Sequence, residues 1–151
     1  MTNYSATMRK PAIPQRTPSI KRRLASMFYE AVLLVALWIT AGFLFLGLHR
    51  DASSGSWRVM FQVYLVAVTG IYFVSFWRWG QTLPMKTWRI RLTDSEGQRP
   101  RVTLAALRYL LAWPSLSLLG VGIFWALVDR DRQFLHDRLT GLRLVDTQAE
   151  A

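Results

Sequence analysis

Two long apolar stretches dominate the pattern of hydrophobic and polar positions along this chain. Leu24–Leu48 contains a single charged residue, Glu30, and no proline, while Val59–Phe76 contains no charged residue at all. At ~1.5 Å per residue, a helix over the first stretch is about 37 Å long, enough to cross the ~30 Å hydrocarbon core of a bilayer. Both stretches therefore predict transmembrane helices.

A third apolar block, Thr103–Val128, has a less regular pattern. Arg108 lies inside it and Pro114 near its middle, and proline interrupts the hydrogen-bond ladder of a helix. We therefore expect a broken element, with an interfacial helix over Leu104–Trp113 and a re-entrant or short hairpin segment through Val128. A plain third span over about 104–128 is the alternative.

Short alternating stretches between and after these blocks predict strands. Thr87–Thr93 alternates, Asp94–Gly97 is a turn signal, and Gln98–Val102 is a possible second strand of a hairpin. Leu142–Asp146 echoes Ile90–Asp94, so these two segments are also candidates to pair. The predicted fold is thus an all-α membrane protein with two full transmembrane helices, a third, proline-broken (re-entrant or spanning) helical element, and a small cytoplasmic β-hairpin cap.

The charge pattern predicts the orientation of the spans. The net charge is +10, and cations cluster before the first span and again between Arg78 and Arg101, whereas the short connection between the two spans carries only Arg50 and Arg58. Lys and Arg collect on the cytoplasmic side of membrane helices, so the N-terminus and the Arg78–Arg101 segment are predicted to be cytoplasmic. The apolar blocks are too long for a soluble nucleic-acid-binding module, and the absence of cysteine excludes disulfides and thiolate metal sites.

The ends of the chain and the predicted interfacial residues complete this picture. Residues 1–20 are expected to form a disordered basic tail and 147–151 a short C-terminal tail, which leaves 21–146 as the membrane domain. The expected partners are the bilayer itself and its anionic head groups, attracted by the cations beside the first span. Trp57, Trp77 and Trp79 are predicted to be interfacial anchors, and Thr69-Gly70 to allow close helix contact.

Arg23 and Glu30 are the first candidate functional residues. They are seven positions apart and share one helix face, separated by ~10.5 Å along the axis. Arg23 is expected to reach the lipid head groups. A carboxylate at bilayer depth costs about 2.5–3.5 kcal/mol on insertion scales, so Glu30 calls for an explanation. It is either a proton- or cation-binding group, or a structural residue that is tied to an arginine such as Arg108 or lies shallow enough to reach water.

The charged run from Asp129 to Arg138 has the alternation typical of a solvated helix face. Its His136-Asp137 pair offers too few ligands for a metal. The chain shows no phosphate loop, nucleophile elbow or paired histidines on a helix, so we expect no enzyme activity, no cofactor and no metal.

Three stretches together resemble the RDD family of small bacterial membrane proteins: Arg22–Glu30, Gly80–Lys86 and Arg132–Gly141. The family is named for one arginine and two aspartates. The resemblance implies that Arg23 is the arginine, that Glu30 takes the place of the first aspartate, and that Asp137 is the second. Pro84 replaces a frequent glycine, and Leu142 a usual threonine. The resemblance further implies a multi-pass protein of the bacterial inner (cytoplasmic) membrane.

Two functions follow as hypotheses. The first is support of ion, proton or small-ligand transport, possibly as a homo-oligomer, with Arg23, Glu30 and Asp137 as the ligand- or ion-binding candidates and Arg108 and His136 as secondary candidates. The second is a non-catalytic assembly or interaction factor. In that case the basic cytoplasmic face, including Trp88, Arg89 and Arg91, docks an unknown protein partner or anionic lipid.

Overall fold

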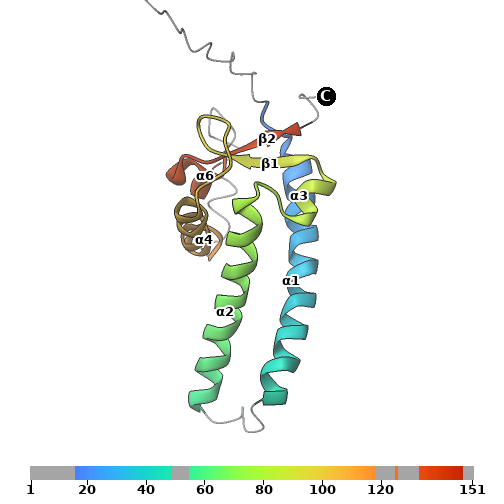
Figure 1. Ribbon diagram of the computed structural model, residues 1–151. Helices are drawn as coiled ribbons and strands as arrows, with labels where there is room; N and C mark the ends of the chain where they lie inside the picture. Colours follow the sequence, from blue (N-terminus) through green and yellow to red (C-terminus); the bar gives the residue numbers. More distant parts are fainter. Residues whose placement is uncertain (1–15, 49–54, 118–124, 126–132, 148–151) are drawn as a thin grey trace, which may run out of the picture.

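Two long antiparallel helices form the body of the protein. The computed structural model describes residues 16–48, 55–117, 125 and 133–147. Helix α1 spans Ile20–Leu48 and α2 spans Gly55–Arg78, and they run side by side (Figure 1). Both are long and apolar enough to cross a membrane, which agrees with the two predicted spans.

A compact layer covers one end of the α1–α2 pair. It consists of the short helix α3 (Leu83–Thr87), strand β1 (Ile90–Thr93), helix α6 (Leu135–Thr140) and strand β2 (Arg143–Asp146), and we call these four elements the cap (Figure 1). The two strands are antiparallel, with Ile90 opposite Asp146 and Thr93 opposite Arg143. The predicted pairing of the two echoing segments is therefore confirmed.

The predicted local hairpin is wrong, because the segment after Gly97 does not form a strand. The Asp94 carboxylate accepts hydrogen bonds from the backbone N–H groups of Glu96 and Gln98, and the Asp94 N–H donates to the Gln98 carbonyl. These bonds close a tight turn. Pro100 then follows, and proline has no N–H to donate to a strand ladder. The sheet is instead completed by β2, about fifty residues downstream.

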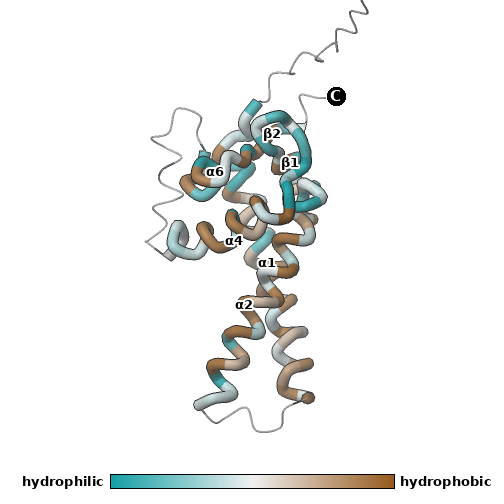
Figure 2. The backbone as a smooth tube through the Cα atoms, turned by 60° about the vertical axis from the view of Figure 1, so that its left-hand side comes forward, coloured by the Kyte–Doolittle hydropathy of each residue, from teal (hydrophilic) through white to brown (hydrophobic). Residues whose placement is uncertain are grey.

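Helix α4 (Val102–Ser117) lies crosswise to α1 and α2, just below the cap (Figures 1 and 2). This placement matches the predicted interfacial helix. The predicted end at Trp113 is wrong, because Pro114 lies inside the helix, which continues to Ser117. Proline sacrifices one helical hydrogen bond, and here only three helical residues follow it. The expected re-entrant segment falls mainly on residues outside the described ranges, as do most of the two predicted tails.

The two ends of the described chain meet at the cap. The Asp146 N–H donates to the Arg16 carbonyl (2.8 Å), and the Arg22 guanidinium at the start of α1 binds the Asp146 carboxylate (2.5 Å). Strand β2 therefore lies at the end of the bundle where α1 begins. A broken third element requires this arrangement, whereas a plain third span would place β2 at the opposite end.

The hydrophobic core lies beneath the sheet and not along the length of α1 and α2. Figure 2 shows hydrophobic positions along both long helices and hydrophilic positions gathered around the cap. One tight turn positions the sheet over α2: Gly80 has φ +87°, and its carbonyl accepts the N–H of Leu92 at 2.7 Å. The core residues are Trp77, Met85, Ile90, Leu92, Ala105, Tyr109, Phe134, Leu142 and Leu144.

Candidate functional site

A buried ion pair joins α4 to α6. Arg108 Nε donates to Asp137 Oδ1 at 2.6 Å, and the two side chains are only 8% and 1% exposed. The face of the guanidinium lies over the Trp77 ring, 4.1 Å from its centroid. Trp77 is thus a buried core residue, and its predicted role as an interfacial anchor is wrong. Burial of two charges is tolerated when they are paired, as Arg108 Nε and Asp137 Oδ1 are. Asp137 Oδ2 has no hydrogen-bond partner among the described residues.

His136 lies next to this ion pair, as a neutral residue. Its Nε2 is 3.5 Å from Nη2 of Arg108, and its Nδ1 is 3.3 Å from the Ser115 hydroxyl. Because an arginine nitrogen only donates, Nε2 accepts and the ring proton belongs on Nδ1. Burial lowers the pKa of His136 to about 4; Asp137 opposes this effect, and the Arg108 and Arg23 cations add to it. His136 therefore adds no positive charge to the site at neutral pH.

Arg23 lies inside the protein, in the first turns of α1. It is 1% exposed, its Nε donates to the Pro18 carbonyl (3.3 Å), and its guanidinium lies 4.7 Å from the centroid of the Phe134 ring. The prediction that Arg23 reaches the lipid head groups is therefore wrong. The cap packs over the start of α1 and covers the side chain of Arg23. The contact between its guanidinium and the aromatic ring partly offsets the loss of hydration.

Glu30 faces the protein and is held by two hydroxyl groups. Tyr72 of α2 donates to Oε1 at 2.7 Å, and Thr82, between α2 and α3, donates to Oε2 at 2.6 Å. Thr82 also caps α3, since its hydroxyl oxygen accepts the Met85 N–H. Arg108 also attracts Glu30 electrostatically. The proposed tie to Arg108 is thus replaced by ties to Tyr72 and Thr82.

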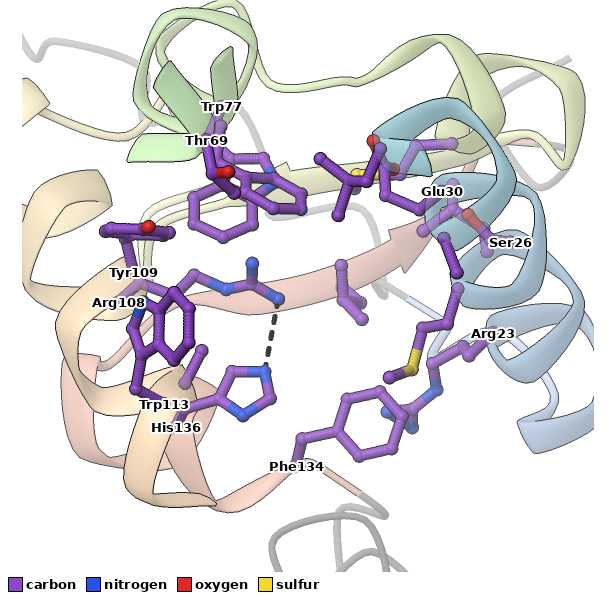
Figure 3. Close-up of a pocket in the computed structure, with 18 of the residues that line it drawn as sticks. Arg23, Ser26, Glu30, Thr69, Trp77, Arg108, Tyr109, Trp113, Phe134 and His136 are labelled. Atoms are coloured by element: carbon purple, nitrogen blue, oxygen red, sulfur yellow. Dashed lines mark hydrogen bonds between the residues drawn. The ribbon is translucent and has the colours of Figure 1, made fainter. Parts of the chain in front are cut away.

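These groups surround one cavity of about 530 Å³ between the long helices, α4 and the cap. Figure 3 shows Glu30, Ser26 and Arg23 on the α1 side of this cavity, and Arg108, Tyr109 and Trp113 on the α4 side. His136 and Phe134 lie between the two groups. The remaining wall is largely aromatic and aliphatic. The volume of the cavity is within the ~300–1,000 Å³ range of small-molecule sites, which combine an apolar wall with a few convergent polar groups.

All five candidate residues predicted from the sequence lie in or beside this cavity, but their contacts differ from the predicted ones. The five are Arg23, Glu30, Arg108, His136 and Asp137. Asp137 has Arg108, a secondary candidate, as its ion-pair partner, while Arg23 acts on it only at longer range. The interpretation of the run ending at Arg138 as a solvated face is wrong for its described part, because Gln133, His136 and Asp137 are buried.

Sequence reasoning missed the residues that hold these groups in place. They are Tyr72, Thr82, Ser115 and Phe134, together with Trp77, which was assigned to the interface. Thr82 alone had a signal, since a threonine two residues before Pro84 is a typical start of a helix. No signal of this kind distinguishes Tyr72 or Phe134 from other aromatic residues of the chain.

The fold and the site define a class: a small helical protein with two membrane-length helices and a cap that encloses charged residues. Comparison with protein families identifies it further. Residues 17–141 match the RDD family, so the chain belongs to the RDD family, a family of small membrane proteins. The match includes Arg23, Glu30, Arg108, His136 and Asp137. No curated protein and no solved structure matches the chain.

Proposed function

We propose that this membrane protein binds a small ligand in the cavity between α1, α2, α4 and the cap, and supports its transport. The observation that carries the proposal is the cavity itself, with Arg23, Glu30, Arg108 and His136 in its wall. A water molecule occupies ~30 Å³ of liquid, so a space of about 530 Å³ fits an organic solute or a hydrated ion better than a bare proton path.

Glu30 is the group that links the cavity to ion or proton transport. It is the single acidic residue of α1, and an ionisable group inside a membrane helix is by default a candidate for an ion or proton pathway. Two hydroxyls hold its carboxylate against the cavity, and the Arg108 cation attracts it electrostatically. In this proposal Glu30 responds to the transported species, and Arg23 and Asp137 stabilise the site.

Within the described residues, a single copy of the chain does not enclose a transport path beyond the cavity. The opposite end of α1 and α2 exposes large apolar side chains, among them Phe43, Leu48 and Val63. We therefore propose that transport involves a homo-oligomer, in which a second copy encloses the remaining path. The concentration of cations at the cap end, against Arg58 at the described start of α2, supports a cytoplasmic cap in a bacterial inner membrane.

The test measures flux in proteoliposomes with an entrapped pH dye, driven by a Na⁺ or K⁺ gradient. Replacing Glu30→Gln removes the charge and keeps the size, and we expect it to reduce cation-dependent pH changes at least tenfold. Glu96→Gln is the matched control, because the same change at an exposed turn should leave flux intact. Equal flux in folded E30Q and wild-type protein, or no flux in the wild type, would contradict the proposal.

A second candidate function, as an assembly or interaction factor, is supported by the exposed residue Trp79. Trp79 is 64% exposed, and its ring centroid lies near two guanidiniums, 5.9 Å from that of Arg78 and 5.8 Å from that of Arg99. An indole beside two cations suits an interface with anionic head groups. Native mass spectrometry should then show that Arg78→Gln/Arg99→Gln retains less phosphatidylglycerol than Lys86→Gln. Equal retention would count against this candidate.

A further inference from the structure

The cavity changes in character along α1. Arg23, Glu30, Leu34 and Trp38 all line it, at spacings of seven, four and four residues, which place them on one face of the helix. From Arg23 to Trp38 this face extends ~22 Å along the axis. The wall is charged at the cap end, and beyond Glu30 on α1 it is formed by Leu34 and Trp38, whose indole N–H donates to the Thr69 hydroxyl at 2.8 Å. Phe73 of α2 and Trp113 of α4 add further aromatic surface.

The charge available to a ligand at the cap end is positive. Both oxygens of Glu30 already accept hydrogen bonds from hydroxyl groups. Arg108 uses Nε for Asp137 and Nη2 for His136, and none of the hydrogen bonds among the described residues uses its Nη1. Figure 3 shows the Arg108 guanidinium pointing into the cavity, and the neutral His136 does not compete with it for an anion.

An Arg108 Nη1 group without a hydrogen bond to the described residues, together with a long apolar wall, selects a ligand with one acidic and one apolar end. A small hydrophilic anion would leave the wall from Leu34 to Trp38 without a partner. A purely apolar molecule would cover the Arg108 Nη1 donors without bonding them, and burying an unsatisfied polar group costs roughly 1–3 kcal/mol. An amphiphile meets both requirements.

We propose that the cavity binds a single-chain amphiphile whose acidic head group, a carboxylate or a phosphate monoester, binds Arg108 and whose apolar chain lies along α1 toward Trp38. This inference rests on the ligand-binding role proposed above and names the class of ligand. Arg23 contributes a second positive charge at the head-group end. The lateral position of the cavity beside two membrane-length helices suits a molecule that enters from the lipid.

The experiment uses the full chain in lipid nanodiscs and a twelve-carbon carboxylate brominated at its chain end. Bromine quenches tryptophan fluorescence at short range, so we expect saturable quenching that is largely lost in Trp38→Phe. Dodecyl phosphate and dodecanoate should compete with the probe, and the stronger competitor identifies the head group. Dodecyltrimethylammonium, dodecyl maltoside and acetate should not compete. Competition by the cationic or neutral amphiphile at equal strength would overturn the proposal.

Two sets of variants separate the head-group contact from the chain contact. Arg108→Gln with Asp137→Asn replaces the ion pair by a neutral pair and avoids an unpaired buried charge, and we expect at least about tenfold weaker probe binding, as for loss of a charged hydrogen bond. Ala31→Leu fills the cavity wall and should also abolish saturable quenching, whereas Ala36→Leu, on α1 outside the cavity, should not. Unchanged binding in A31L would overturn the proposal.

The result is separable from the flux test. Saturable, Arg108-dependent binding in a protein without flux would support the amphiphile site and contradict transport. Flux that depends on Glu30, in a protein that shows no saturable quenching by the probe, would support transport and overturn the proposed amphiphile site.

Discussion

The two ends of the α1–α2 pair are covered in different ways. At the cap end, α4 and the cap bury Arg23, Glu30 and the core beneath the sheet. At the far end, the two helices contact mainly each other, with Phe45 packed against Phe61 and Tyr64 at centroid distances of 5.1 and 5.3 Å.

This difference separates what the protein supplies itself from what its surroundings supply. The cap end binds most of its buried polar groups with its own side chains, as the bonds of Glu30, Arg108 and His136 show. The far end leaves most of its apolar side chains exposed. In a protein of a membrane family, lipid or another copy of the chain covers such an apolar surface. Chemistry and intrinsic stability should therefore concentrate at the cap end, and substitutions at the two ends should have unequal effects.

The largest effect is expected for Asp137→Ala, at the cap end. It leaves the Arg108 guanidinium buried without its counter-charge, and removing one partner of a buried ion pair typically costs about 3–5 kcal/mol. We expect a loss of this size in the free energy of unfolding, measured by denaturant titration of tryptophan fluorescence. The double variant R108Q/D137N should recover much of it. A loss below about 1 kcal/mol for D137A would show that the cap end does not depend on this pair.

The second prediction concerns pH and His136. Its pKa is about 4 in the folded protein and ~6.5 when unfolded, so the unfolded state binds more protons between these values. Stability is therefore expected to fall as the pH drops from about 6.5 to about 4, by about 3 kcal/mol in total, and to be insensitive to this group above that window.

His136→Gln should flatten this dependence, because glutamine does not titrate. The measurement compares the free energy of unfolding of wild-type and H136Q protein at pH 7 and pH 4.5. Since Asp137, Arg108 and Arg23 face the ring in both proteins, the difference between the two slopes isolates the histidine. Identical slopes would mean that His136 is not buried in its neutral form.

The spans could be predicted from the sequence because apolar length is a local property. The apolar runs Leu24–Leu48 and Val59–Phe76 identify α1 and α2 without any tertiary information. The pairing of β1 with β2 was also predictable, because the two segments share one pattern. The family resemblance further selected Arg23, Glu30 and Asp137, all of which lie in the region of the cavity.

The partners of these residues could not be predicted, because they depend on how α4 and the cap pack. A sequence pattern shows that Arg108 interrupts an apolar helix, but its bond to Asp137 depends on α6 folding back beneath the sheet. Trp77 has the position of an interfacial anchor but becomes a core residue, because Arg108 covers one face of its ring and Phe73 stacks with it. In the same way, Thr82 reaches Glu30 only after the turn at Gly80 reverses the chain.

The last prediction compares two helix glycines, one at each end of the pair. A Cβ on Gly70 would lie 3.0 Å from Cε1 of Tyr109, whose hydroxyl donates to the Val66 carbonyl at 2.8 Å. The ring cannot move away without straining this bond, so Gly70→Ala should cost about 1–3 kcal/mol, as overpacking does. A Cβ on Gly47 would meet nothing within 4 Å among the described residues. Gly47→Ala should be neutral or gain less than about 1 kcal/mol through helix propensity.

The Gly47 result also tests the far end in its native surroundings. The free energy of unfolding is measured for both variants in detergent and in nanodiscs assembled at high protein content. If lipid covers the far end, G47A stays neutral in both, because acyl chains adapt to one added methyl group. A loss above about 1 kcal/mol in the nanodiscs alone would place a second copy against this face. The far end would then be a protein interface, and its contrast with the cap end would disappear on assembly.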